Sequence, residues 1–169
     1  MRVCLLNATP CSILASSLRM SDAGVVRLLL FRVGRLVCAA EAERVREILP
    51  RLDPTRIPGA PPVVAGVVNV RGTLVTVVEG WRALRQPEPS ADGEGGGTTV
   101  LLEVGGGKKV LGFTVDEVVD LVSVGGETLE RRQALPGIDP TLVRAVGRRA
   151  DQLFVVLDTD ALLTPILSS

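Results

Sequence analysis

Short runs of valine and leucine, separated by glycine and proline, make up most of this 169-residue chain. Residues 25–33 and 36–40 are two apolar runs joined by a Gly34-Arg35 turn, and residues 45–49 alternate apolar with polar side chains. Short apolar runs between turn residues, and alternation with a period of two, are typical of β-strands. The pattern therefore predicts a β-rich protein with many turns, and not a helical bundle.

The strand pattern continues on both sides of a proline-rich crossing. Prolines recur between residues 50 and 62 and exclude a helix or a central strand there, because proline has no backbone N–H group. Short helices are predicted at residues 81–85 and 160–163. The further strands that the pattern predicts are residues 63–70, 73–79, 98–104, 110–115, 118–124 and 152–158.

The pattern of the first half recurs in the second half. Val33-Gly34 corresponds to Val104-Gly105, and residues 42–49 correspond to residues 115–122, acid for acid and apolar for apolar. The strand at residues 74–79 matches residues 153–158 in the same way. Units of about 60 residues bury too little surface to be stable alone. We therefore expect two related β units that pack face to face and share a core.

The repeat sets the expected organisation of the chain. The first unit covers about residues 25–84, where the chain closes back, and the second covers about residues 98–163. Between them, residues 86–97 are rich in Gly, Pro and acidic residues, which is typical of a solvated linker. Residues 1–19 are too short and too polar to span a membrane, and we expect a disordered extension there, ahead of one domain at 20–169.

Charge and composition exclude several kinds of function. The 19 basic and 19 acidic residues balance, so the chain lacks the broad positive field that nucleic-acid binding requires. No histidine is present, which removes Ser-His-Asp and Cys-His catalysis and His-ligated zinc. The three cysteines form no C-x-x-C pair and fit a reduced cytoplasmic protein. We expect a binding or scaffold protein without a cofactor, a metal or catalysis.

Three carboxylates carry the alternative, a small-ligand-binding β-barrel or an enzyme. Asp116 and Glu117 are adjacent, and Asp158 follows the last predicted strand. Acid–base work would require these groups to converge in a deep pocket with perturbed pKa values. No further ligand stands at a spacing that would complete a metal site.

The turn at Asn69-Val70-Arg71-Gly72 lies between two apolar runs. Asn and Gly are ordinary turn residues, so the segment has a purely structural interpretation. An arginine at this position also extends outward in a fixed direction, and its guanidinium can bind a partner's carboxylate through two hydrogen bonds. Both interpretations remain open on these residues alone.

A set of spaced residues around this turn is similar to a known protein family. Upstream are Phe31, Val33, Gly34, Val45, Glu47 and Ile48; the central run is Pro58, Pro61, Val64, Gly66, Val67, Asn69, Arg71, Gly72, Leu74, Val75, Val77 and Val78; downstream are Gly112, Phe113, Val115, Asp116 and Val118. This pattern resembles the CheW family of chemotaxis coupling proteins, from about Val25 to Leu163.

The resemblance implies a fold and a role. The fold is all-β, with two small five-stranded SH3-like β-barrels packed across a shared hydrophobic core, and short helices. The role is that of a non-catalytic adaptor that couples the tips of methyl-accepting chemoreceptors to the regulatory domain of the histidine kinase CheA. Such proteins are cytoplasmic and associate with membrane-anchored receptor arrays, without membrane insertion. The partner-binding residues that the resemblance implies are Val45, Glu47, Asn69, Arg71, Gly72 and Val118.

The chain also departs from the family pattern. The family usually has Asp-Leu-Arg after the strand that ends near residue 78, whereas this chain has Glu79-Gly80-Trp81-Arg82. Arg148-Arg149 follows a glycine that the family keeps. These departures affect the choice of partner more than the fold, and a regulatory CheW-like domain of a chemotaxis kinase is a closely related alternative.

Overall fold

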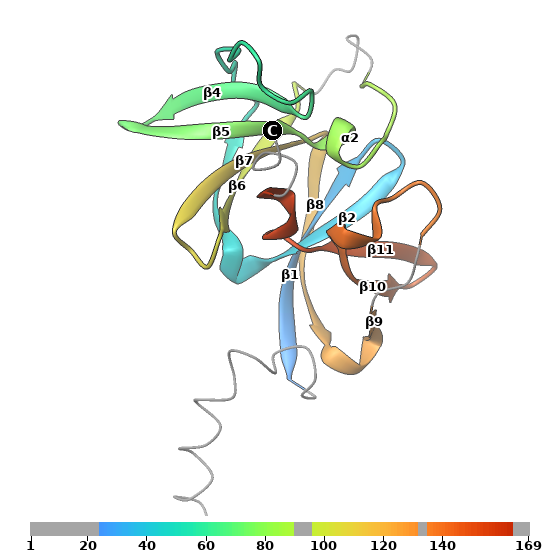
Figure 1. Ribbon diagram of the computed structural model, residues 1–169. Helices are drawn as coiled ribbons and strands as arrows, with labels where there is room; N and C mark the ends of the chain where they lie inside the picture. Colours follow the sequence, from blue (N-terminus) through green and yellow to red (C-terminus); the bar gives the residue numbers. More distant parts are fainter. Residues whose placement is uncertain (1–23, 90–95, 132–134, 164–169) are drawn as a thin grey trace, which may run out of the picture.

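The computed structural model describes residues 24–89, 96–131 and 135–163, and these form two β-sheets (Figure 1). The first sheet has six strands in the order β8-β1-β2-β11-β10-β9, and the second has five in the order β3-β6-β7-β5-β4. The first sheet comprises β1 (Val25–Val33), β2 (Leu36–Glu41), β8 (Glu117–Gly125), β9 (Leu129–Arg131), β10 (Val143–Arg149) and β11 (Gln152–Leu157). The second comprises β3 (Val45–Pro50), β4 (Val64–Val70), β5 (Thr73–Glu79), β6 (Thr98–Val104) and β7 (Lys109–Val115).

The all-β prediction is confirmed, and the helices are short. The predicted helix after the fifth strand is α2 (Gly80–Ala83), and the remaining helical turns are η1 (Ala42–Arg44), η2 (Gly126–Thr128), η3 (Pro140–Leu142) and η4 (Ala161–Leu163). No helix in the described ranges has the length and apolarity to cross a membrane. The expected extension at 1–19 lies outside the described residues.

Two strands of the first sheet were not predicted. β10 carries arginines at both ends and a register shift between Val143 and Ala145, which interrupts the alternation of apolar and polar side chains. β9 has only three residues and lies at the edge of the sheet, paired with β10. An interrupted pattern and a very short edge strand both lack the periodicity on which the sequence prediction depends.

The two sheets do not coincide with the expected halves at 25–84 and 98–163. The hairpin β1–β2 joins β8, β10 and β11 of the second half, while β6–β7 joins β3, β4 and β5 of the first half. The chain changes sheet after β2 and again after β7. The two related halves therefore exchange hairpins, and each sheet contains strands from both.

Equivalent strands occupy equivalent places in the two sheets, as the internal repeat predicts. β2 pairs parallel to β11 with Cys38 opposite Val155, and β7 pairs parallel to β5 with Leu111 opposite Thr76. A register shift after Val45 in the β3–β6 ladder has its counterpart in the β8–β1 ladder. The repeat is thus present in the pairing register as well as in the sequence.

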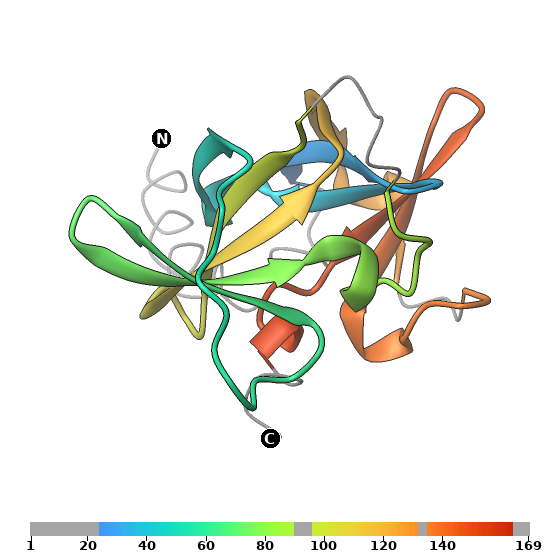
Figure 2. The same cartoon turned by 90° about the horizontal axis from the view of Figure 1, so that it is seen from above.

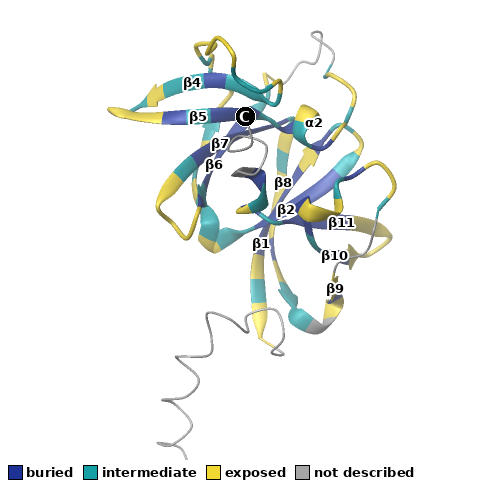
Figure 3. Cartoon of the chain, viewed as in Figure 1, coloured by how far each residue is buried: buried dark blue, intermediate teal, exposed yellow. Residues whose placement is uncertain are grey.

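The predicted shared core lies where the two sheets face each other (Figure 3). Phe31 of β1 packs edge-to-face on Phe113 of β7, with ring centroids 5.9 Å apart. β1 is buried on both faces: Leu29 contributes to this main core, and Leu30 to a second cluster inside the curl of the first sheet. This explains why the middle of β1, residues 28–31, is a continuous apolar run without alternation.

Candidate functional site

The hairpin β4–β5 projects from the second sheet and is exposed at its tip (Figures 2 and 3). Val70 pairs with Thr73, so Arg71 and Gly72 form a two-residue loop. Their φ angles are 52° and 85°. Positive φ at both loop residues is the geometry that matches the twist of a tight hairpin. Arginine adopts this conformation at a cost of order 1 kcal/mol, so the loop holds Arg71 in a strained position.

Asn69 stabilises the loop from inside. Its Oδ1 atom accepts a hydrogen bond of 2.7 Å from the backbone N–H of Gly72. An asparagine side chain that bonds a backbone N–H a few residues ahead fixes a turn locally, without help from the core. Three of the predicted site residues, Asn69, Arg71 and Gly72, therefore form one rigid tip.

Arg71 forms a bidentate ion pair with Glu47 of β3. Its Nη1 donates to Oε2 at 2.9 Å and its Nη2 to Oε1 at 2.6 Å. The Arg71 side chain is still 75% exposed and that of Glu47 is 27% exposed. The sequence pointed to both residues, but not to their contact. The ion pair leaves most of the guanidinium surface accessible while it fixes the direction of the side chain.

The position of this ion pair shows how strongly the second sheet curls. β3 and β4 are the two edges of that sheet, separated by β6, β7 and β5. Four inter-strand steps would place the edges about 19 Å apart in a flat sheet. Glu47 of β3 nevertheless touches the β4–β5 turn. Neither sheet closes into the expected barrel by backbone pairing among the described strands, so each is a curled half-barrel.

The first sheet has an equivalent ion pair. Arg149, at the end of β10, donates from Nη1 to Oδ2 of Asp120 on β8 at 2.8 Å. Ala150, in the β10–β11 turn, has the same φ of 52° as Arg71. The Arg149 hydrogen bond is the main reason that the pKa of Asp120 is lowered, and a hydrogen bond from the Leu121 backbone adds to it. The sequence repeat already aligned Glu47 with Asp120, so this pair could have been found from it.

Two exposed apolar side chains lie on the strands that carry the Arg71–Glu47 ion pair. Leu74 is opposite Asn69 in the hairpin and is 73% exposed, while Ile48 follows Glu47 on β3 and is 45% exposed. Successive side chains of a strand point to opposite faces, so Ile48 lies on the other face of β3 from Glu47, and Leu74 is the exposed apolar side chain of the hairpin itself. The sequence pattern did not single these two out as site residues, because exposed and buried positions look alike in a valine-rich hairpin.

The two predicted valines are not both at the tip. Val45 begins β3, two residues before Glu47, and Val118 lies on β8 of the other sheet. Both are partly buried and pack against the main core. The structure thus groups Val45 with Glu47, Asn69, Arg71 and Gly72 on the second sheet, and it places Val118 at the equivalent position of the first sheet. We call the group on the second sheet the coupling surface.

The three carboxylates of the alternative hypothesis have separate structural partners. Asp116 accepts a hydrogen bond from the Gly34 backbone N–H at 2.7 Å, and Glu117 forms an ion pair with Arg32 at 3.1 Å. Asp158 accepts the backbone N–H groups of residues 160 and 161. Across the described ranges, no group of three or more metal-ligating side chains is found. The carboxylates support turns and strand edges, and nothing in their contacts favours acid–base chemistry.

Two curled sheets and an exposed hairpin tip define a small all-β domain. Residues 27–166 match the family model of the CheW-like domain, and the chain belongs to that family. The chain is 25% identical over 140 residues to the chemotaxis protein CheW of Bacillus subtilis. This match covers 81% of this chain and 86% of that protein. It is 30% identical over 121 residues to a probable chemotaxis protein CheW of Rhizobium etli, with 72% and 74% covered.

A solved structure agrees with the fold. The scaffolding protein TtCheW from Thermoanaerobacter tengcongensis superposes with a TM-score of 0.75 and 17% sequence identity. The match covers 83% of this chain and 93% of that one. The two chains therefore share the same overall fold.

Proposed function

We propose that this protein is a chemotaxis coupling adaptor that links chemoreceptors to the histidine kinase CheA and catalyses no reaction itself. The family membership supports this role, as do the relatives named chemotaxis protein CheW and the structural neighbour named a scaffolding protein. The proposed place of action is the cytoplasmic side of a receptor array, where receptor tips and kinase meet.

The observation that carries the proposal is the rigid arginine at the tip of β4–β5. A side chain that is 75% exposed, yet fixed by a bidentate ion pair, loses little conformational freedom when a partner covers it. Leu74, which is 73% exposed on the same hairpin, supplies apolar surface close to the tip. Arginine is one of the residues most often found at binding hot spots.

We assign the receptor contact to the coupling surface, with Val45, Glu47, Asn69, Arg71 and Gly72, and we include Val118 through the family resemblance. Arg71 acts as the anchor in this assignment. Glu47 orients it, and Asn69 with Gly72 fixes the turn that presents it. Val45 packs between this surface and the main core, so a change there would alter both binding and stability.

Binding measurements with the receptor fragment encoded in the same genome test this proposal. Arg71→Ala is expected to weaken receptor binding by at least about tenfold. Arg149→Ala removes the equivalent ion pair from the first sheet and is the matched control. Unchanged receptor binding by the Arg71→Ala protein would remove the coupling surface from the proposal.

A further inference from the structure

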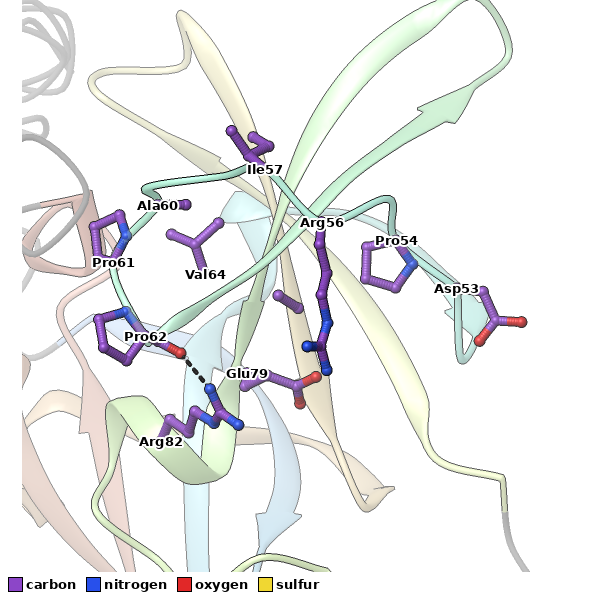
Figure 4. A pocket seen from close by; sticks show the side chains of 11 residues that line it. Asp53, Pro54, Arg56, Ile57, Ala60, Pro61, Pro62, Val64, Glu79 and Arg82 are labelled. Carbon is purple, nitrogen blue, oxygen red and sulfur yellow. Dashed lines mark hydrogen bonds between the residues drawn. The ribbon is translucent and has the colours of Figure 1, made fainter.

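A pocket of about 420 Å³ lies beside the proline-rich crossing, away from the tip of β4–β5 (Figure 4). Its apolar wall includes Pro54, Ile57, Pro61 and Val64. Ile57 is 43% exposed, although it belongs to a segment rich in apolar side chains. Exposed apolar surface in a concave site is a feature of ligand and peptide binding.

The pocket is formed by a segment that is fixed at both ends. Thr55 exchanges two backbone hydrogen bonds of 2.8 and 2.9 Å with Val67 of β4, and the N–H of Glu79 donates to Val63 at 2.9 Å. Gly66 permits this close approach, because a Cβ atom there would lie 2.1 Å from the Thr55 carbonyl oxygen. A wall fixed in this way exists before any partner binds, which lowers the entropic cost of binding.

Arg82 supplies one fixed guanidinium. Its Nη1 donates to the Pro62 carbonyl oxygen at 2.7 Å, and its guanidinium carbon lies 4.7 Å from the centre of the Trp81 ring. Stacking and one hydrogen bond hold the side chain, and within the described residues its other N–H donors form no further hydrogen bond. This Trp-Arg pair is where the chain departs from the usual family pattern.

Arg56 supplies a second guanidinium and directs it toward Glu79 and Arg82 (Figure 4). It takes part in none of the ion pairs and hydrogen bonds found across the described ranges. The Oε2 atom of Glu79 accepts hydrogen bonds from Trp81 Nε1 at 3.1 Å and from Thr114 Oγ1 at 3.0 Å, and its Oε1 atom lies 3.8 Å from Arg51 Nη2. Its negative charge is therefore already paired with Arg51, and it is not paired with Arg56 or Arg82 among the described residues. Asp53 lies at the far end of the pocket, with its carboxylate directed away from the two guanidiniums (Figure 4).

A second hollow adjoins the pocket. Pro61, Pro62 and Arg82 line both of them, and Trp81 and Arg85 line the second. An elongated ligand can therefore extend across Arg82 from one hollow to the other. Arg85 adds positive charge at the far end.

We propose that this double pocket binds an extended, acidic segment of a partner protein. A glutamate or aspartate carboxylate lies between Arg56 and Arg82, and a neighbouring apolar side chain packs on Ile57 and Pro61. The apolar wall, the two guanidiniums and the elongated shape together fit such a peptide. The site is separate from the coupling surface and does not depend on the receptor assignment.

Trp81 is the single tryptophan of the chain, so its indole N–H resonance reports binding at this site alone. The probe is the acetylated and amidated peptide Leu-Pro-Glu-Leu-Pro, titrated into the full-length ¹⁵N-labelled protein. The matched probe has glutamine in place of glutamate. The glutamate peptide is expected to shift the Trp81 indole resonance and to bind at least about tenfold more tightly than the glutamine peptide.

Variants complete the test. Arg56→Ala changes an exposed side chain and is expected to weaken binding of the glutamate peptide by about fivefold to tenfold. Arg27 is another exposed arginine, and the variants Arg27→Ala and Arg71→Ala are expected to bind the glutamate peptide as tightly as the unchanged protein does. Absent binding, equal affinity for both peptides, or full affinity in Arg56→Ala would overturn the proposal. Acetate that matches the peptide in affinity would instead identify a site for small anions and would also overturn it.

Discussion

Replacing Arg71 by alanine separates the two roles that the structure gives this side chain. The variant loses the ion pair to Glu47, which bridges the edges of the second sheet. An ion pair with a largely exposed arginine contributes about 0–1 kcal/mol, because water screens it. Alanine has a Cβ atom, as arginine does, so the backbone strain at the positive φ of residue 71 stays about the same. The free energy of unfolding should fall by less than about 1 kcal/mol.

The binding effect should be larger than the stability effect. Truncation of an arginine hot spot costs about 2 kcal/mol, which is roughly a 30-fold increase in the dissociation constant for the receptor fragment. Urea denaturation measures the stability of the variant, and isothermal titration calorimetry with the receptor fragment measures its affinity. A protein of this size loses about 2–4 °C in Tm per kcal/mol, so the Arg71→Ala protein should remain folded at 25 °C.

Arg149→Ala provides the control that decides the interpretation. It removes an ion pair of the same kind from the other sheet, between the end of β10 and the edge strand β8. We expect a similar small loss of stability and no loss of receptor affinity. If both variants lost receptor affinity equally, the effect would follow from weakened sheet closure, and the anchor role of Arg71 would be refuted.

Three further predictions concern the fold. Gly66→Ala should lower the free energy of unfolding in urea by at least about 2 kcal/mol, because the new Cβ would collide with the Thr55 carbonyl; wild-type stability would contradict the close approach. Burial raises the pKa of the Cys38 thiol to about 12. In a protein whose other two cysteines are replaced by serine, this thiol should therefore react with Ellman's reagent only as fast as the protein unfolds. Immediate reaction in native buffer would contradict this. Because the pKa of Asp120 is lower in the folded protein than its unfolded value of about 3.9, the ionised carboxylate stabilises the fold above that pH. This stabilisation is lost as the pH falls through the folded pKa, so Asp120→Asn should flatten the fall in stability below about pH 4. An unchanged fall in stability with acid would contradict the shift.

The strands could be predicted from the sequence, but their partners could not. A period of two indicates which side chains face the core, and the runs at β1, β5 and β6 were found within a residue or two of their observed ends. The two-residue period does not indicate that the β1–β2 and β6–β7 hairpins are exchanged between the sheets. Both hairpins are apolar on the same positions, so either sheet could accept either hairpin as far as the local pattern shows.

The candidate site was predicted in part for the same reason. Asn69 and Gly72 form a turn through contacts within four residues, and such local chemistry is visible in the sequence. The contact of Arg71 with Glu47 depends on the curl of a whole sheet, which no short motif records. The double pocket was missed because its shape depends on Thr55 and Val67 bonding across 12 residues of chain, although Trp81 and Arg82 were already conspicuous as departures from the family.

The most direct test of the adaptor role is the autophosphorylation rate of the CheA kinase on membranes that contain its receptor, measured with and without this protein. The account predicts that receptor control of the kinase appears only when the protein is added, and that Arg71→Ala restores much less of this control than Arg149→Ala. Equal kinase activity with and without the protein, at concentrations that saturate both partners, would contradict the account.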